Sequence, residues 1–142
     1  MVLVCHLHTI IHMRKCQKIA LPVWSDQICA VLDFAQLLLV VEAEGASEIS
    51  RKYYALTSET ALFRARYIRN LGVQELICGA LSYPLQTLLG SYGITVIPYI
   101  CGHVDEVLQA YKKGNLSQSY FRLPGCPPYT KGRMGRRGSW TL

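Results

Sequence analysis

Apolar residues follow two different spacings along the chain, and the change between them separates predicted strands from predicted helices. A short apolar segment over residues 18–23 predicts a first strand. Apolar segments over 37–43 and 49–56 flank a Glu-Gly-Ala-Ser turn and predict a β-hairpin. From Ala61 onward the apolar positions recur at helical spacing until Gly72, and a glycine is typical of a helix end.

Two matching strand–helix units follow this first helix. Apolar segments over 75–78 and 94–101 each precede a stripe of apolar residues spaced as on one face of a helix. Strands separated by helices pair in parallel through right-handed crossovers. We therefore predict an α/β domain with three layers, of the ribonuclease H-like kind. Its mixed five-stranded sheet has strands 18–23, 75–78 and 94–101 parallel at the centre and helices on both faces. The two stripes are Leu85, Leu88, Leu89 and Tyr92, and Val104, Val107, Leu108 and Tyr111.

The ends of the chain differ from its middle in charge. The chain has 142 residues and a net charge of +6, and this length suits a single domain. Residues 1–18 carry +3 and residues 122–142 carry +5, whereas the residues between them hold seven basic residues and all nine acidic ones. A large phosphate-binding face on the core is therefore not expected, which argues against nucleic acid as the main partner.

We divide the chain into an N-terminal extension outside the fold (1–17), an α/β domain (18–121) and a basic tail rich in Pro, Gly and Arg (122–142). An extra strand over residues 2–7 is the alternative for the first segment. The longest apolar run, 37–41, is far shorter than the roughly 20 residues of a membrane span. Six widely spaced cysteines without a secretory signal favour a reduced, cytoplasmic protein.

Cysteines stand at the ends of the strands that open these two units. The sequence Leu-Ile-Cys-Gly occurs at 76–79 and Tyr-Ile-Cys-Gly at 99–102. Ligands of open α/β sheets bind outside the carboxyl ends of the strands, where helix N-termini present free N–H groups. A helix N-terminus favours the thiolate, which is the form that binds iron or zinc, so these thiols are candidate metal ligands.

The candidate site residues follow from this chemistry. Cys101 and His103 supply a thiol and an imidazole to a metal ion or cluster, and Cys29 and Cys126 are further candidates for the same set. No Cys-x-x-Cys pair occurs, so the spacing specifies no known metal site. The predicted helix start at Ser82 has no acid in its first turn and is suited to receive an anion.

Each candidate also has a simpler interpretation. Cys78 is favoured as a buried core residue, because free cysteine is among the most buried residue types. Cys101 and His103 fit a plain strand end with a surface histidine equally well. Cys126 also fits an idle thiol in a tail.

Motifs of common enzyme classes are missing from the sequence. It holds no glycine-rich phosphate loop and no serine-nucleophile motif. A ribonuclease H-type nuclease needs several carboxylates that converge on two metal ions, and only Asp26, Asp33 and Glu42 are candidates. We therefore expect a non-enzyme, and a metal-dependent nuclease is the least favoured alternative.

Short motifs occur in a fixed order along residues 18–126. They lie at 19–23, 28–35, 38–42, 71–73, 76–80, 93–98, at 101–107 (Cys-Gly-His-Val-Asp-Glu-Val) and at 123–126 (Leu-Pro-Gly-Cys). In this order they resemble the dinitrogenase iron-molybdenum cofactor biosynthesis family, whose members are similar to nitrogenase accessory factors.

The resemblance implies a ribonuclease H-like fold that binds iron-sulfur or iron-molybdenum-type precursors and carries them during metallocluster assembly. It also implies that the loop after the first strand and the strand-end edge form the binding face. The family loop usually reads Ile-Ser-Pro, whereas this chain has Ile28-Cys29-Ala30, so a thiol is gained and the stiffening proline is lost. Because many relatives lie outside nitrogen-fixation gene sets, the resemblance does not establish a nitrogenase role.

The leading hypothesis is a cytoplasmic carrier that holds an anionic cluster through Cys101, with contributions from His103 and Cys29. The helix N-terminus at Ser82 offsets the charge of the cluster, and a cluster-assembly or acceptor protein is the expected partner. The alternative from another class is a metal-free interaction or regulatory module whose basic tail, residues 127–142, docks an acidic partner.

Overall fold

The computed structural model describes residues 16–45, 47–57, 60–116 and 121–124. The strands and helices that the sequence predicts within these residues are all present, and a two-residue strand and a short 3-10 helix join them. The elements in chain order are β1 (Cys16–Trp24), β2 (Gln27–Ile28), η1 (Leu32–Phe34), β3 (Leu37–Glu44), β4 (Ser47–Ala55), α2 (Ala61–Asn70), β5 (Glu75–Ile77), α3 (Tyr83–Ser91), β6 (Thr95–Ile97) and α4 (Val104–Lys113).

The strands form one open, mixed sheet in the order β4-β3-β1-β5-β6, with β2 paired to the end of β1. β1 pairs in parallel with β5, and β5 pairs in parallel with β6, so the three predicted parallel strands are neighbours. β3 and β4 form the predicted antiparallel hairpin. Two details of the prediction are wrong: β6 is an outer strand rather than a central one, and β2 makes the sheet six-stranded.

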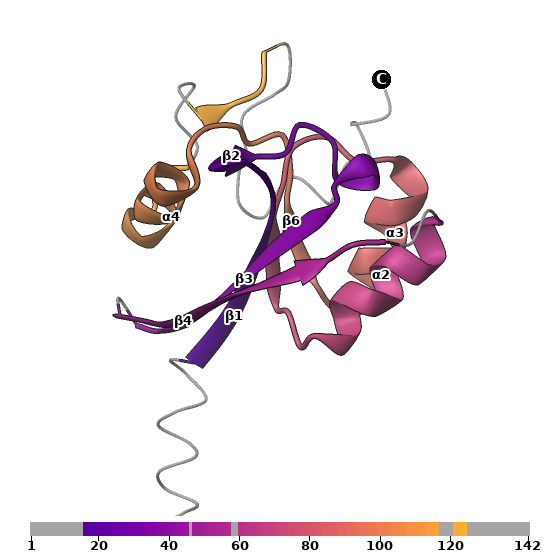
Figure 1. Cartoon of the computed structure of the whole chain (residues 1–142), viewed down its shortest axis with the longest axis horizontal. Coiled ribbons are helices and arrows are strands. Elements are labelled where there is room, and N and C mark those ends of the chain that lie inside the picture. The colour runs from indigo at the N-terminus through magenta and orange to yellow at the C-terminus, as the bar shows by residue number, and fades with distance from the viewer. Residues whose placement is uncertain (1–15, 46, 58–59, 117–120, 125–142) are drawn as a thin grey trace, which may run out of the picture.

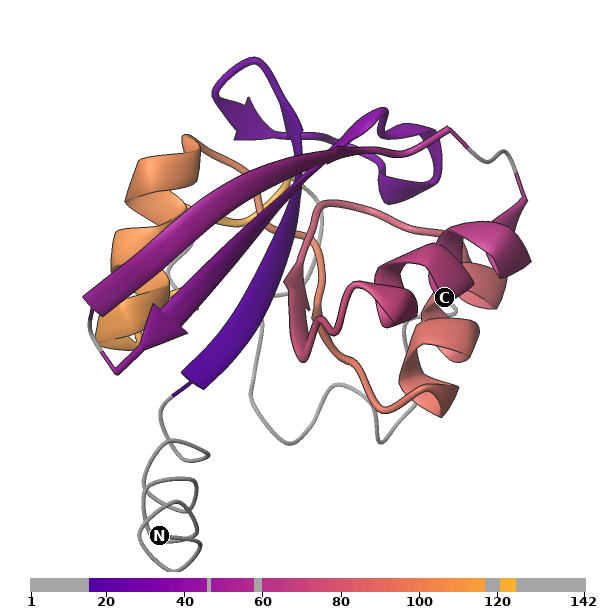
Figure 2. The same cartoon turned by 60° about the horizontal axis from the view of Figure 1, so that its bottom comes forward.

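Helices cover both faces of the sheet, as predicted. α4 lies on one side, and α2 and α3 lie together on the other (Figures 1 and 2). The sequence of β1 is almost continuously apolar because both faces of the strand are buried. Ile19, Leu21 and Val23 pack in the cluster on the α4 side, whereas Ala20 packs in the cluster on the α2 and α3 side. A central strand that is buried on both faces has no polar side to alternate with.

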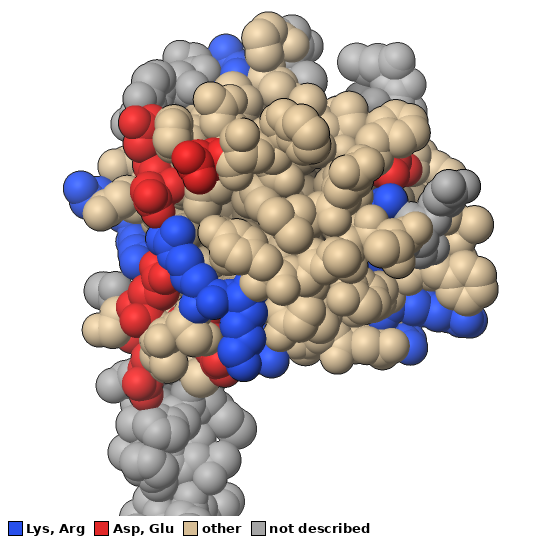
Figure 3. All heavy atoms as spheres, in the orientation of Figure 1, with Lys and Arg blue, Asp and Glu red and all other residues tan. Residues whose placement is uncertain are grey.

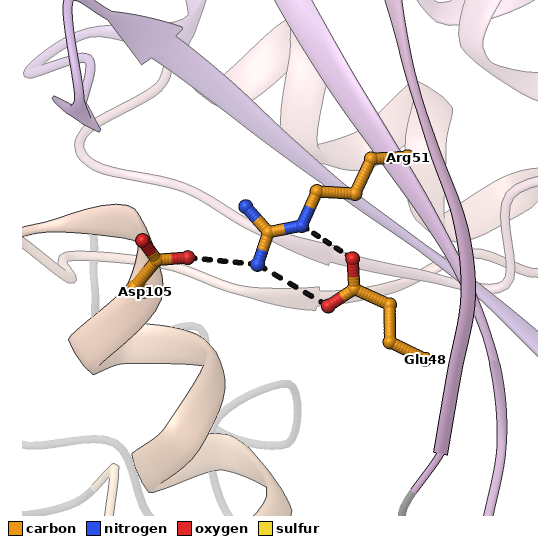
Figure 4. A network of polar contacts seen from close by, with 3 residues as sticks. All are labelled: Glu48, Arg51 and Asp105. Atoms are coloured by element: carbon orange, nitrogen blue, oxygen red, sulfur yellow. Dashed lines mark hydrogen bonds and ion pairs between the residues drawn. The ribbon is translucent and has the colours of Figure 1, made fainter.

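One charged network fastens α4 to the outer hairpin. Arg51 of β4 donates two hydrogen bonds to the carboxylate of Glu48 and one, at 2.7 Å, to Oδ1 of Asp105 in the first turn of α4 (Figure 4). The hydrogen bond to Glu48 and the contact with Asp105 raise the pKa of Arg51 above its ordinary value, although partial burial opposes the rise. Asp105 therefore helps to hold α4 against the sheet, beyond its favourable position near the helix N-terminus.

The last predicted strand is much shorter than expected. It was predicted over 94–101, but β6 ends at Ile97. Pro98 has no N–H to donate to a neighbouring strand, and Tyr99 has a φ of 66°, in the left-handed region. Cys101 consequently lies in a loop four residues after the strand rather than at its end.

The described residues reach beyond both ends of the range 18–121, whose bounds as a domain stay a prediction. β1 begins at Cys16, two residues before the predicted start, and Arg122 pairs with Ile100 where the tail was expected to begin. The N-terminal extension up to residue 15 and the tail from residue 125 lie outside the described residues. Within the described part of the chain, no helix is long and apolar enough to cross a bilayer.

Candidate functional site

Three loops meet at the carboxyl edge of the parallel strands. They are residues 25–36 after β1, residues 78–82 after β5 and residues 98–103 after β6. The first loop hydrogen-bonds to both others. The N–H of Ile28 donates to the carbonyl of Gly102 at 2.9 Å. The N–H groups of Leu32 and Ala80 donate to the carbonyls of Ala80 and Ala30 at 2.8 and 2.7 Å. The edge is therefore built by backbone contacts between segments that are distant in sequence.

Gly79 shows how closely two of these loops approach. A Cβ atom at this position would lie 2.3 Å from the carbonyl oxygen of Ala30 and 2.8 Å from that of Cys29. Both neighbours are backbone atoms, which cannot swing away as a flexible side chain would. The glycine of the Ile-Cys-Gly motif is thus required so that the Cys29 loop can lie on the end of β5.

Cys29 and Cys101 lie in two of the loops that meet at this edge. Each lies one residue from the hydrogen bond between Ile28 and Gly102. Both thiols are free and partly exposed. The Cys29 thiol lies 3.6 Å from the carbonyl oxygen of Val31, to which it donates weakly. Both thiols thus belong to loops of the carboxyl edge and are partly accessible.

His103 is exposed and occupies the N-cap position of α4, where its side chain makes no capping hydrogen bond. Its backbone pairs with Gln27 of β2 in an antiparallel bridge. His103 is thus two residues after Cys101 at the start of α4, and the bridge to the β2 segment fixes its backbone.

Ser82 is at the start of α3, as predicted, but its donors already have a partner. Its N–H and its hydroxyl donate to the two carboxylate oxygens of Asp33, at 2.7 and 2.6 Å. The hydroxyl also caps the helix by accepting from the N–H of Leu85. Asp33 thus supplies an anion to this helix N-terminus from within the protein. An external anion at this position would have to compete with it.

Arg64 is a site residue that the sequence analysis missed. This residue of α2 is only 5% exposed, and its Nη1 donates to the carbonyl oxygen of Ala35 at 2.6 Å. Burial lowers the pKa of Arg64, and the charges of Asp33 and Cys29 oppose that fall. A buried cation therefore lies beneath the Cys29 loop. The sequence contained a sign of this burial, because Arg64 falls on the apolar stripe of α2 with Ala65.

Cys78 is the buried core residue that the simpler interpretation predicts. It is 0% exposed and packs in the cluster between the sheet and helices α2 and α3. Burial, with a smaller contribution from the charge of Asp33, raises the pKa of the Cys78 thiol above its ordinary value. A neutral, enclosed thiol of this kind is a poor metal ligand.

No preformed site for a single metal ion is present in the described part of the chain. Among those residues, no three Cys, His, Asp or Glu side chains gather closely enough to hold an ion. Cys29, Cys101 and His103 share the carboxyl edge without converging on one point. Cys126, the remaining candidate, lies outside the described residues.

Comparison with known proteins shows the fold. No protein-family model and no curated protein sequence matches the chain. Three solved structures resemble it at similar levels. PH0822 is 18% identical with a TM-score of 0.68, and the match covers 73% of this chain and 96% of that protein. A provisionally named dinitrogenase, MJ0327, from Methanocaldococcus jannaschii is 17% identical with a TM-score of 0.59, over 71% and 91% of the two chains. The apo form of the orange protein from Desulfovibrio gigas is 19% identical with a TM-score of 0.60, and the match covers 75% of this chain and 95% of that protein.

Proposed function

We propose that this protein binds an iron-sulfur or iron-molybdenum-type cluster, or a precursor of one, and carries it without catalysing a reaction. The observation that carries the proposal is the hydrogen bond between Ile28 and Gly102, which brings two partly exposed thiols, Cys29 and Cys101, to one edge of the sheet. Thiolates are the preferred protein ligands of iron in such clusters. The cluster is the cargo of the protein.

The edge offers ligands of the kind that a cluster uses. Two partly exposed thiols and an imidazole are carried by loops that meet there. A cluster has several metal atoms at its corners, so Cys29 and Cys101 can each bind a different one. His103 is positioned to contribute an imidazole. The buried positive charge of Arg64 beneath the Cys29 loop favours a cargo with net negative charge.

The fold and its relatives support the same function. The sheet order, with three parallel strands and an antiparallel hairpin, supports a ribonuclease H-like domain. The names of two structural relatives, a provisionally assigned dinitrogenase and the orange protein, support membership in the dinitrogenase iron-molybdenum cofactor biosynthesis family. We infer a cytoplasmic carrier that passes its cargo to an acceptor protein, and nitrogen fixation is one process such a carrier serves.

Anaerobic reconstitution with iron and sulfide tests this function. We expect the wild-type chain to retain iron and sulfide with a visible charge-transfer absorption, and the Cys29→Ala/Cys101→Ala double variant to lose at least four-fifths of both. His103→Ala should lose less, because an imidazole can be replaced by water or added thiol.

Cys16→Ala is the matched control, because Cys16 is an exposed free thiol at the opposite end of β1. It should retain the wild-type iron and sulfide content. Unchanged content in the double variant, or an equal loss in Cys16→Ala, would remove the proposed site.

A further inference from the structure

A groove of about 430 Å³ lies between the segment that leaves β4 and one face of α2. Residues 55–57 form one side of the groove, and Phe63, Arg66, Tyr67 and Asn70 lie on the other. This volume falls within the usual range of small-molecule pockets. The lining combines two aromatic rings, a guanidinium, an amide and backbone, which is the mixture of apolar and orienting polar groups that such pockets contain.

The two rings in the groove are available for stacking. Phe63 is 56% exposed and Tyr67 is 37% exposed, although both belong to a helix whose opposite face is buried. Exposed aromatic rings that share a groove offer flat apolar surfaces to a planar ligand. A ring system is therefore the part of a ligand that this helix face fits best.

The guanidinium of Arg66 lies over one of these rings. Its Cζ atom is 5.9 Å from the centroid of Phe63, at the outer limit of a cation–π contact, and a guanidinium presents N–H groups that bind anions. The other arginine of the lining, Arg64, is buried and donates to Ala35, so it adds positive charge without direct contact. The amide of Asn70 is exposed and can donate and accept within the same groove.

The charge around the groove also favours an anion. α2 contains three arginines and no acidic residue. In Figure 3 most of the visible Asp and Glu side chains lie on the side of α4 and the β3–β4 turn, whereas Lys and Arg lie on both sides of the visible face. The arginines of α2 supply positive charge beside the groove, which favours a ligand with negative charge.

We propose that this groove binds a small ligand in which a planar aromatic ring is joined to a phosphate, the chemistry of a nucleoside monophosphate. The ring stacks on Phe63 and Tyr67, Arg66 binds the phosphate, and Asn70 orients the edge of the ring. A small ligand is favoured over a nucleic acid strand because the stacking rings and the accessible guanidinium all line one groove of about 430 Å³ rather than an extended track. The proposal does not depend on the cluster-carrier function.

Calorimetric titration of the metal-free full chain at constant ionic strength tests the proposal. The probes are adenosine monophosphate, adenosine and inorganic phosphate, and oligoadenylate and hexaglutamate are titrated for comparison. We expect the monophosphate to bind at least tenfold more tightly than either fragment. Arg66→Gln should reduce that affinity at least tenfold, and Phe63→Ala should reduce it several-fold.

Arg69→Gln is the matched control. Arg69 lies on the same helix and also covers an aromatic ring, with its Cζ atom 4.5 Å from the centroid of Tyr92, but it is not part of the groove. It should keep wild-type affinity, and circular dichroism should show that each variant is folded. Equal losses in Arg66→Gln and Arg69→Gln, no monophosphate binding at millimolar concentration, or tighter binding of hexaglutamate or oligoadenylate would each overturn the proposal.

Discussion

The two strand–helix units share the sequence Ile-Cys-Gly but place their cysteines in different environments. Cys78 follows β5 directly and is fully enclosed, whereas Cys101 lies in a loop and is partly exposed. Pro98 and Tyr99 end β6 early and bend the chain back, and the N–H of Ile100 then donates to the carbonyl of Cys78 at 2.9 Å. The residues before the motif therefore decide whether its cysteine is enclosed in the core or accessible to solvent.

The helices of the two units are also fastened differently. The start of α3 is held by the partly buried carboxylate of Asp33 on Ser82. The start of α4 is held by an exposed ion pair between Asp105 and Arg51. Partly buried, charge-assisted hydrogen bonds contribute more than exposed ion pairs, which are screened by water and salt. The first unit is therefore expected to tolerate fewer changes than the second.

The largest expected difference concerns the glycines of the two motifs. Gly79→Ala should destabilise the protein by about 3 kcal/mol or more, because the added Cβ meets backbone of the Cys29 loop. Gly102→Ala should cost about 1–2 kcal/mol, since its nearest neighbours are side-chain atoms 3.6 Å away and only its φ of +123° opposes the change. Urea unfolding of both variants measures the difference. Equal losses would contradict the close approach at Gly79.

The second largest difference in stability is expected between substitutions of the two cysteines. Cys78→Ser should cost about 1–3 kcal/mol, because a hydroxyl is buried among apolar side chains. Cys101→Ser should change the free energy of unfolding by no more than about 0.5 kcal/mol, as for most partly exposed positions. Thermal and urea unfolding provide the comparison. A larger loss at Cys101 would reverse the assignment of the two roles.

The pH dependence of stability provides a second test of the enclosure of Cys78. Because burial raises the pKa of Cys78, the folded state retains a proton that the unfolded chain releases near pH 9. This contribution is complete below about pH 8 and is lost as the pH rises, with a limiting slope of about 1.4 kcal/mol per pH unit.

The slope should appear as the difference between wild type and Cys78→Ala in urea unfolding between pH 8 and 10. Subtracting the variant removes the contribution of tyrosines and lysines, which titrate in the same range. A difference that does not change with pH would show that Cys78 is not enclosed.

The smallest effect is expected at the ion pair of the second unit. Arg51→Gln should cost at most about 1 kcal/mol, because the pair is largely exposed, and the loss should shrink in 1 M salt. Lys52→Gln on the same strand is the control and should change little. A loss at Arg51 that persists in high salt would indicate that its packing matters more than its charge.

Local patterns predicted most of the fold. The hairpin followed from two apolar segments around a Gly-containing turn, and the helices from their stripes and terminal glycines. β2 and the early end of β6 were not predicted, because β2 is only two residues long and the positive φ that follows β6 falls on a non-glycine residue. β2 exists where Trp24 and Gln27 pair at the end of β1, and β6 ends where Tyr99 adopts a positive φ.

The candidate site itself stays a prediction, and only the positions of its loops can be compared with the structure. Sequence position placed Cys29, Cys101 and His103 at one edge, and the structure puts their loops in hydrogen-bond contact. The partnership of Asp33 with Ser82 was not foreseen, since 49 residues separate them. The buried charge of Arg64 was also missed, because a charged residue on a helix is normally assigned to its solvated face.

The central claim is that a cluster binds at the carboxyl edge through Cys29 and Cys101. Thiol footprinting tests it most directly: the chain is alkylated with iodoacetamide before and after anaerobic loading with iron and sulfide, and each cysteine is quantified by mass spectrometry. We predict that loading slows alkylation of Cys29 and Cys101 at least tenfold and leaves Cys16 unchanged. Equal alkylation of Cys29 and Cys101 in the loaded and unloaded protein would contradict the account.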